Sequence, residues 1–287
     1  MIAVFKRELR SYFTGITGYI FIAFVLFFVG IFAMFINFRN RVPYFEYVLG
    51  NMNFVYLIII PIITMRTISE ERRQKTDQLL YSLPINLSLV VWGKYLAMVA
   101  VLLIPTVIMC IYPVFLSFYG SVNLASAYGA IFGFFLLGAA LIAVGLFLSS
   151  LTDNQIVAAV LSFGVTLLFF LMSPLASLVP STSMGSFVGF TVLVVILGLI
   201  VYLMTRNSTA AAGSAVLLEG CLAAIYFIKP EILEGVFKNL LNSLSVFTRL
   251  DNFLNGMFDL TAVVYYLTII LLFVFFTLQS MDKRRWS

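Results

Sequence analysis

Long runs of apolar residues, separated by short polar stretches, dominate the chain. A helix needs about 20 mostly apolar residues to cross the hydrocarbon core of a bilayer. Runs of this kind occupy residues 16–36, 48–67, 90–117, 127–150, 155–175, 187–205, 210–228 and 261–280. The pattern predicts an all-α, polytopic membrane protein of about eight transmembrane helices, with residues 1–287 forming a single transmembrane domain.

The first 14 residues show a helical alternation of apolar and charged positions. The apolar face carries residues at i, i+4, i+7 and i+8, namely Phe5, Leu9, Tyr12 and Phe13. The other face carries Lys6, Arg7, Glu8 and Arg10. Such a helix lies in the membrane interface with its basic face toward anionic lipid headgroups. Two roles stay open for it, a simple anchor for the first span and a mechanical element.

Residues 69–84 are the most charged stretch of the chain and are predicted to form a short helix. Acidic residues at its start suit the positive end of the helix dipole. Opposite charges occur at i,i+4 spacing in the pairs Glu71–Lys75 and Arg73–Asp77. A leucine cluster follows before the proline that ends the run. The stretch is either a solvated connection between two spans or a helix that docks into a groove on a soluble partner.

Residues 229–260 form a long polar separator with a second helical rhythm. Its apolar positions at i, i+3, i+4, i+7 and i+8 are Leu233, Val236, Phe237, Leu240 and Leu241. We expect an amphipathic helix on the outer membrane interface. It either contacts an extracytoplasmic partner or covers a cavity.

The seventeen lysines and arginines set the orientation. With the N-terminus in the cytoplasm, the inner side receives Lys6, Arg7, Arg10, Arg66, Arg72, Arg73, Lys75, Lys94, Arg206, Lys283, Arg284 and Arg285. The outer side receives Arg39, Arg41, Lys229, Lys238 and Arg249. Because cytoplasmic loops carry an excess of basic residues, this distribution predicts a multi-pass protein of the bacterial cytoplasmic (inner) membrane with both termini cytoplasmic. Topology thus explains the basic composition, and no nucleic-acid partner is expected.

The amino-acid composition excludes several kinds of catalytic and metal-binding site. Apolar residues make up 62% of the chain and charged residues 10%, against about 25% charged in a soluble domain. Histidine is absent, which excludes imidazole bases and histidine metal ligands. Cys110 and Cys221 lie apart within apolar runs and form no metal or redox pair. We therefore predict no catalytic residue and no metal site, and hence not an enzyme.

Glu219 is the one acid in the middle of a predicted span. Because an ionisable group is costly in a bilayer, it indicates a function by default. Its neighbours Gly213, Ser214 and Gly220 are small, so a contact between packed helices is the alternative.

Residues 68–85 and 91–97 resemble the corresponding region of ABC-2 type permeases. They read Ile-Ser-Glu-Glu-Arg-Arg-Gln-Lys-Thr-Asp-Gln-Leu-Leu-Tyr-Ser-Leu-Pro-Ile and Val-Trp-Gly-Lys-Tyr-Leu-Ala. The resemblance implies that residues 69–84 are a cytoplasmic coupling helix seated in a cleft of an ABC ATPase subunit. The implied contacts fall on Glu70, Glu71, Arg72, Arg73, Thr76, Leu79, Leu80 and Pro84.

Residues 145–159 are also similar to these permeases, most closely to the gliding-motility and nitrous-oxide-reductase-associated branches. This resemblance implies a second cytoplasmic contact at Thr152, Asp153 and Asn154, while the alternative is that these residues only cap and turn. Residues 247–287 resemble the gliding-motility branch. The two runs within 187–228 depart from the usual six spans, and form either two full spans or a re-entrant hairpin.

The resemblance implies the permease subunit of an ATP-driven exporter of an unidentified substrate. The chain has no G-x-x-x-x-G-K-[ST] motif, so ATP and Mg²⁺ are expected on a separate ATPase subunit. Further expected partners are a second permease copy or a homologous permease, and membrane lipid. The alternative is a membrane scaffold that transmits ATPase motion to an extracytoplasmic auxiliary protein, as in motility or cofactor maturation, without moving a substrate.

Overall fold

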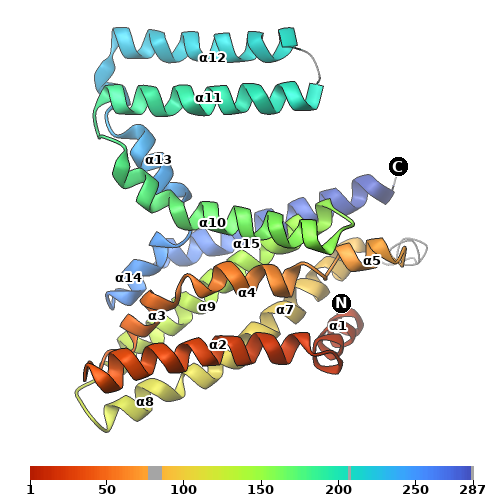
Figure 1. Cartoon of the computed structure of the whole chain (residues 1–287), viewed down its shortest axis with the longest axis vertical. Helices are drawn as coiled ribbons and strands as arrows, with labels where there is room; N and C mark the ends of the chain where they lie inside the picture. Colours follow the sequence, from red (N-terminus) through yellow and green to blue (C-terminus); the bar gives the residue numbers. More distant parts are fainter. Residues whose placement is uncertain (77–85, 206–207, 286–287) are drawn as a thin grey trace. The chain divides into compact units, whose positions relative to one another are not determined.

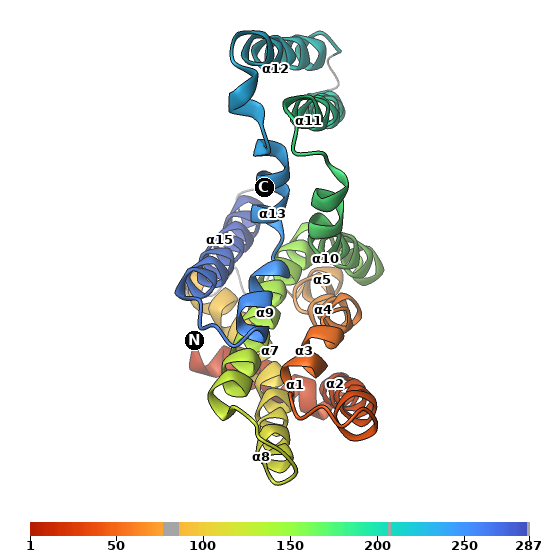
Figure 2. The same ribbon diagram turned by 90° about the vertical axis from the view of Figure 1, so that its left-hand side faces the viewer.

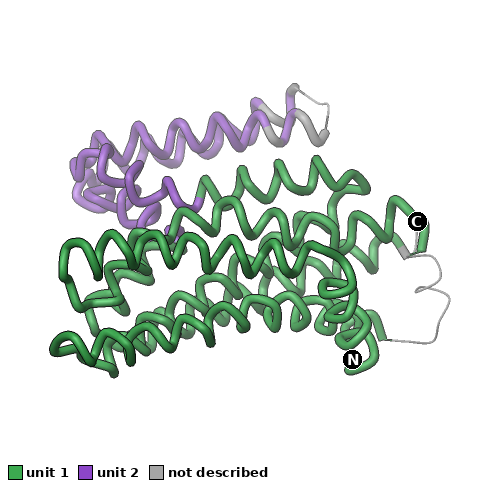
Figure 3. The backbone as a smooth tube through the Cα atoms, turned by 60° about the horizontal axis from the view of Figure 1, so that its bottom comes forward, with its two compact units in different colours: residues 1–168, 246–287 green, residues 169–245 purple. Residues whose placement is uncertain are grey.

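The computed structural model describes residues 1–76, 86–205 and 208–285. Helices account for almost all of this part of the chain, and it contains no strand. The predicted all-α class is confirmed. The chain divides into two compact units, residues 1–168 with 246–287, and residues 169–245 (Figure 3).

Unit 1 is a bundle of helices (Figure 1). It contains α1 (Ile2–Thr14), α2 (Thr17–Ala33) with the π-helical turn Met34–Arg39, α3 (Glu46–Met52), α4 (Val55–Thr64), α5 (Ser69–Arg73), α7 (Leu87–Met109), α8 (Ile111–Ser117), α9 (Leu124–Leu151), the first part of α10 (Gln155–Leu178), the 3-10 turn Thr248–Leu250, α14 (Asp251–Leu254) and α15 (Leu260–Arg285).

Helix α9 forms the core of unit 1. It packs against α4, α7 and α15, and most of its length is buried. Small residues on α9 allow these close approaches. A β-carbon at Gly138 would lie 2.8 Å from the Tyr56 hydroxyl oxygen, and one at Gly145 would lie 2.5 Å from Thr64 Oγ1. The Tyr56 ring stacks on Phe134 at 4.4 Å, and its hydroxyl donates to the Phe134 carbonyl (2.9 Å).

Unit 2 contains a helical hairpin. Its elements after the end of α10 are α11 (Ser183–Thr205), α12 (Ser208–Ile228), the 3-10 turn Pro230–Leu233 and α13 (Val236–Leu244). Helices α11 and α12 run side by side along their length (Figures 1 and 2).

Several helices qualify as membrane spans by length and composition. Within the described residues, five helices are long and apolar enough to cross a membrane, and a sixth span results if α3 and the helical segment after it are counted together. That pair is bent by 64° where the polar residues Asn51 and Asn53 interrupt the apolar run. The predicted spans at 187–205 and 210–228 correspond to α11 and α12. Whether α11 and α12 form two full spans or a re-entrant hairpin stays open, as the sequence left it.

The predicted amphipathic helix within 229–260 is interrupted. Gly235 adopts φ 68°, a left-handed conformation that glycine tolerates and that separates the turn Pro230–Leu233 from α13. Phe237 on α13 is buried and meets Phe190 of α11 edge to face at 5.1 Å. Phe237 therefore packs within unit 2, whereas Val236 on the same helix is exposed.

Candidate functional site

Three separate stretches of unit 1 converge near the N-terminus: α1, the segment from Thr64 through α5, and the start of α7 (Figure 1). Gly93 permits this approach. A β-carbon at Gly93 would lie only 3.0 Å from Val4 Cβ on α1. The absence of a side chain at Gly93 thus brings α1 close over the neighbouring Lys94.

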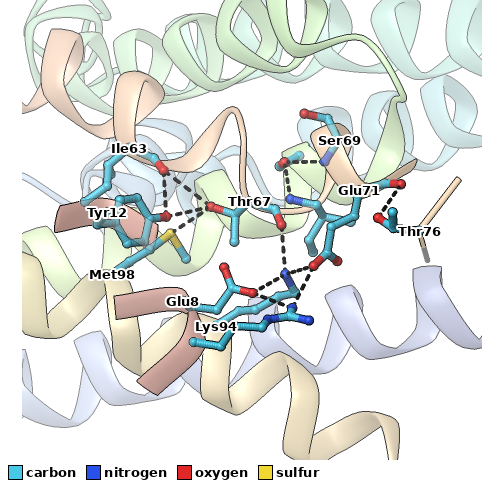
Figure 4. A network of polar contacts seen from close by, with 12 residues as sticks. Glu8, Tyr12, Ile63, Thr67, Ser69, Glu71, Thr76, Lys94 and Met98 are labelled. Carbon is cyan, nitrogen blue, oxygen red and sulfur yellow. Dashed lines mark hydrogen bonds and ion pairs between the residues drawn. The ribbon is translucent and has the colours of Figure 1, made fainter. Parts of the chain in front are cut away.

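The Lys94 ammonium group is the centre of the site (Figure 4). Its side chain is completely buried. Lys94 Nζ lies 2.8 Å from Glu71 Oε1 and 3.1 Å from Glu8 Oε1. It also donates to the Thr67 carbonyl oxygen at 3.0 Å. The three donors of the ammonium group on α7 are thus matched by three acceptors, one from α1 and two from the segment that ends in α5.

Arg7 completes a four-charge group, which we call the Lys94 cluster: Arg7, Glu8, Glu71 and Lys94. Arg7 Nη2 lies 2.7 Å from Glu8 Oε1 and 2.9 Å from Glu71 Oε1. Burial raises the pKa of Glu8, but the charges and hydrogen bonds of Lys94 and Arg7 outweigh it and hold that pKa below the ordinary glutamate value. The hydrogen bond to Glu8 raises the pKa of Arg7. The Glu8 carboxylate therefore stays ionised at neutral pH.

A second group of hydrogen bonds joins α1 to the end of α4. The Tyr12 hydroxyl donates to the Ile63 carbonyl oxygen (3.2 Å) and lies 3.1 Å from Thr67 Oγ1. Thr67 Oγ1 lies 3.3 Å from Met98 Sδ on α7 (Figure 4). Burial raises the pKa of Tyr12, so its hydroxyl keeps its proton as a donor.

The core helix α9 holds the same segment from the other side. Ser149 Oγ accepts from the backbone N–H groups of Ile68 (3.3 Å) and Ser69 (3.2 Å), and donates to the Met65 carbonyl (3.3 Å). The Ser69 hydroxyl also donates to the Met65 carbonyl. The turn before α5 is therefore fixed to α1, α7 and α9 together.

The structure divides the predicted coupling residues between the interior and the surface. Glu71 belongs to the Lys94 cluster, Arg72 is buried, and Glu70 forms an ion pair with Arg66 at 2.8 Å. Arg73 is exposed, as are the two residues after it, Gln74 and Lys75. Of the predicted coupling residues up to Thr76, Arg73 is therefore the one that offers a fully exposed side chain to a partner.

The predicted continuous helix over 69–84 is wrong in its described part. Helix α5 ends at Arg73, and Lys75 adopts φ 58°. The predicted Glu71–Lys75 pair is also wrong, because Glu71 turns inward to Lys94 and Arg7. Thr76 Oγ1 donates to the Glu71 carbonyl (3.2 Å). Asp77, Leu79, Leu80 and Pro84 lie outside the described residues.

The other predicted cytoplasmic contact is a short turn between α9 and α10. Asn154 N donates to Thr152 Oγ1 (3.2 Å), and Ile156 N donates to Asn154 Oδ1 (2.9 Å), which is the capping alternative. Asp153 forms an ion pair with Arg284 near the end of α15 (2.7 Å). A contact of these residues with a partner stays a prediction.

The predicted basic residues of α1, Lys6, Arg7 and Arg10, are all exposed, and Arg7 also reaches the acids of the Lys94 cluster. Contact of Lys6 and Arg10 with lipid headgroups stays a prediction.

Glu219 lies within unit 2. Thr191 Oγ1 on α11 donates to Glu219 Oε1 on α12 at 2.7 Å. This bond joins the two helices of the hairpin, which is the contact expected from the packing alternative. A transport role for Glu219 stays a prediction.

Sequence reasoning missed the role of Glu8 and treated Lys94 only as an inner-side charge and part of a motif. The signal for Lys94 was its position within an apolar run, where a charged group needs a partner. Nothing in the local pattern identified that partner, because Glu8 is 86 positions away along the chain.

Helices long and apolar enough to cross a bilayer define the class of this chain, a multi-pass integral membrane protein. A family profile described as "ABC-2 family transporter protein" matches residues 48–283. The chain belongs to this family, which confirms the resemblance at the level of the family and gives no support to a particular branch. Comparison with curated proteins and with solved structures gave no match. Family membership makes the chain a membrane subunit of an ABC transporter and implies an ABC ATPase partner.

Proposed function

We propose that the chain is the permease subunit of an ABC-2 exporter and that the segment around α5 passes the movement of a separate ATPase to the membrane helices. The Lys94 cluster carries this proposal. It joins three helices through one buried ammonium group: α5, the long apolar helix α7, and α1, which is predicted to lie in the membrane interface.

The energetics of burial make this connection stiff. Removing one partner of a buried ion pair costs about 3–5 kcal/mol, because an uncompensated charge stays behind. If α5 moved without α7, Glu71 would move away from Lys94. The buried ammonium group would then lose one of its two carboxylate partners. A displacement of α5 is therefore cheaper when α1 and α7 move with it. ATP and Mg²⁺ belong to the ATPase subunit in this proposal.

A cleft beside the cluster supports docking of a partner here. It has a volume of about 330 Å³ and lies along α1 and α5. Glu8, Glu70 and Glu71 line it together with Arg66, and each of the three carboxylates already has an ion-pair partner within unit 1. The cleft offers space beside the cluster for a side chain of the ATPase. The roles of Leu79, Leu80 and Pro84 rest on the family resemblance.

The exporter has more support than the scaffold alternative. A scaffold needs a free surface for an extracytoplasmic partner, and the predicted surface was the amphipathic helix within 229–260. Phe237, on the apolar face of α13, is packed against α11. Pairing with a second permease copy or a homologous permease, the inner-membrane location and the gliding-motility or nitrous-oxide-reductase branch are further parts of the proposal, inferred from the sequence.

Charge reversal on the exposed part of the coupling segment tests the proposal. The double variant Arg73→Glu/Lys75→Glu should reduce the amount of ABC ATPase that co-purifies with the tagged chain from native membranes by about tenfold, a loss of about 1.4 kcal/mol of association. The ATPase is quantified by mass spectrometry. Lys229→Glu, an exposed lysine expected on the outer side, is the matched control. Equal amounts of ATPase with wild type and the double variant would contradict the proposal.

A further inference from the structure

The end of unit 1 opposite the Lys94 cluster contains a pocket of about 400 Å³. Helix α9 connects the two ends: Ser126 near its start lines the pocket, and Ser149 near its end binds the segment before α5. At 1.5 Å per residue, these serines lie roughly 35 Å apart along the helix. In Figure 1, α3 and α14 mark the pocket end of the unit, and α1 and α5 mark the other end.

Three parts of the chain form the walls, at α3, at the start of α9 and at the end of α14. The polar lining residues are Tyr44, Glu46, Tyr47, Asn123, Ser126 and Asn255. Asn123 Oδ1 already accepts from the backbone N–H groups of Ala125 and Ser126, and so caps α9. The side-chain carbonyl of Asn123 is thus already used to cap α9, which forms part of the pocket wall.

Glu46 is the unusual residue of this pocket. It is only 6% exposed, and its Oε2 atom has no hydrogen-bond partner among the described residues. A buried acceptor without a hydrogen bond is costly, and more so when it is charged. Glu46 lies in the first turn of α3. Glu46 thus lines the pocket as a buried acid, and its Oε2 atom has no donor among the described residues.

Two tyrosines flank this carboxylate. Tyr44 is 45% exposed and Tyr47 is 57% exposed, and their rings meet edge to face at 6.0 Å. The face of an aromatic ring attracts a cation within about 6 Å of its centre. A single carboxylate beside aromatic rings is a poor site for Ca²⁺, which takes 6–8 oxygen ligands. The described residues also contain no group of three or more histidine, cysteine or acidic side chains suited to a metal.

We propose that this pocket binds an organic ammonium group, with Glu46 as its counter-ion and Tyr44 and Tyr47 as its aromatic wall. The ammonium N–H groups donate to the Glu46 carboxylate, and the rings stabilise the positive charge. A free amine and the headgroup of an ethanolamine lipid share this chemistry. The proposal does not depend on the ATPase, so it stands or falls separately from the proposed function.

The first experiment uses free ethanolamine and the purified full chain in detergent. Binding is measured as a saturable rise of the thermal unfolding midpoint, with ethylene glycol as the uncharged analogue. Lipid binding is measured in parallel by native mass spectrometry with phosphatidylethanolamine and phosphatidylglycerol. Binding of free ethanolamine identifies a soluble amine as a sufficient ligand, whereas selective retention of phosphatidylethanolamine alone identifies the lipid headgroup. Either result supports the proposal, and binding of neither ethanolamine nor phosphatidylethanolamine overturns it.

Variants locate the binding in this pocket. Glu46→Gln should weaken binding of the amine probe at least about tenfold, while Glu231→Gln, which removes an exposed acid elsewhere, should leave it unchanged. Tyr47→Phe keeps the ring face and should bind like wild type, whereas Tyr47→Leu should bind severalfold more weakly. Tyr47 is exposed, so its variants decide the question if Glu46→Gln fails to fold. The proposal is overturned if both Glu46→Gln and Tyr47→Leu bind the probe with wild-type affinity. If Glu46→Gln does not fold, wild-type affinity in Tyr47→Leu alone overturns it.

Discussion

Lys94 and Glu46 show how differently one chain treats two buried charges. The ammonium group of Lys94 meets two carboxylates and a carbonyl oxygen within 3.1 Å. One carboxylate oxygen of Glu46 meets no partner within the described residues. A satisfied buried charge fixes structure, whereas an unsatisfied one retains the capacity to bind. We accordingly assign mechanical connection to Lys94 and ligand recognition to Glu46.

The pKa of Glu8 predicts how stability depends on pH. Its folded-state pKa lies below the ordinary value despite burial, because Lys94 and Arg7 stabilise the charged form. The resulting stabilisation is present above the unfolded-state pKa of about 4.3 and is lost as the pH falls through the folded-state value. The unfolding midpoint of the wild type should therefore fall at acidic pH below about 4.3.

Glu8→Gln should flatten this acid limb, measured by thermal unfolding in detergent between neutral and acidic pH. Glu231→Gln has the same charge change at an exposed position and should keep the wild-type profile. An acid limb of equal steepness in Glu8→Gln and wild type would show that the cluster does not contribute in this way.

Among the helices, α9 decides the arrangement of unit 1. Its glycines differ sharply in their surroundings: Gly145 faces Thr64 of α4, Gly133 faces Phe253 of α14, and Gly129 has no neighbouring atom within 4 Å of its would-be β-carbon. Gly129 and Gly133 are four residues apart, a spacing that permits close helix packing, but only Gly133 has a close neighbour.

Substitution at these glycines tests the central role of α9. Gly145→Ala should destabilise the protein by about 1–3 kcal/mol, because the new methyl group overpacks the contact with Thr64. Gly129→Ala on the same helix should cost nothing or slightly stabilise, since alanine is the better helix former. Thermal unfolding of both variants in one detergent gives the comparison. Equal midpoints would show that α4 and α9 do not approach as closely as described.

Across the molecule, the segments expected in the cytoplasm gather at one end of unit 1. The Lys94 cluster ties the N-terminal helix to α5, and Arg284 ties α15 to the turn after α9. Both termini and two connecting segments thus lie toward the same side of the bundle (Figure 1), as the positive-inside count requires.

Accessibility of single cysteines tests this orientation. In a chain whose native Cys110 and Cys221 are replaced by serine, Arg73→Cys and Lys6→Cys should react with a membrane-impermeant maleimide only after the cells are opened. Lys229→Cys should react in intact cells. All three positions are exposed, so access to the compartment decides the result. Reaction of Arg73→Cys in intact cells would reverse the orientation and remove the basis for a cytoplasmic coupling segment.

The sequence alone determined the helical class, the approximate spans and the family motif, because these depend on local properties. A helix satisfies its own backbone hydrogen bonds in lipid, so the length and spacing of apolar runs are sufficient to predict it. The family motif at residues 68–76 and the distribution of lysine and arginine likewise depend only on the order of residues along the chain.

Only the tertiary structure decided which charges meet. Glu71 pairs with Lys94 and Arg7 in place of the nearby Lys75, and Phe237 packs on α11 in place of facing lipid. The break at Gly235 and the burial of Glu46 also escaped the helical pattern. Such outcomes depend on which distant segments pack together, and the free energy of a buried charge is set by those neighbours and by the loss of solvent around it.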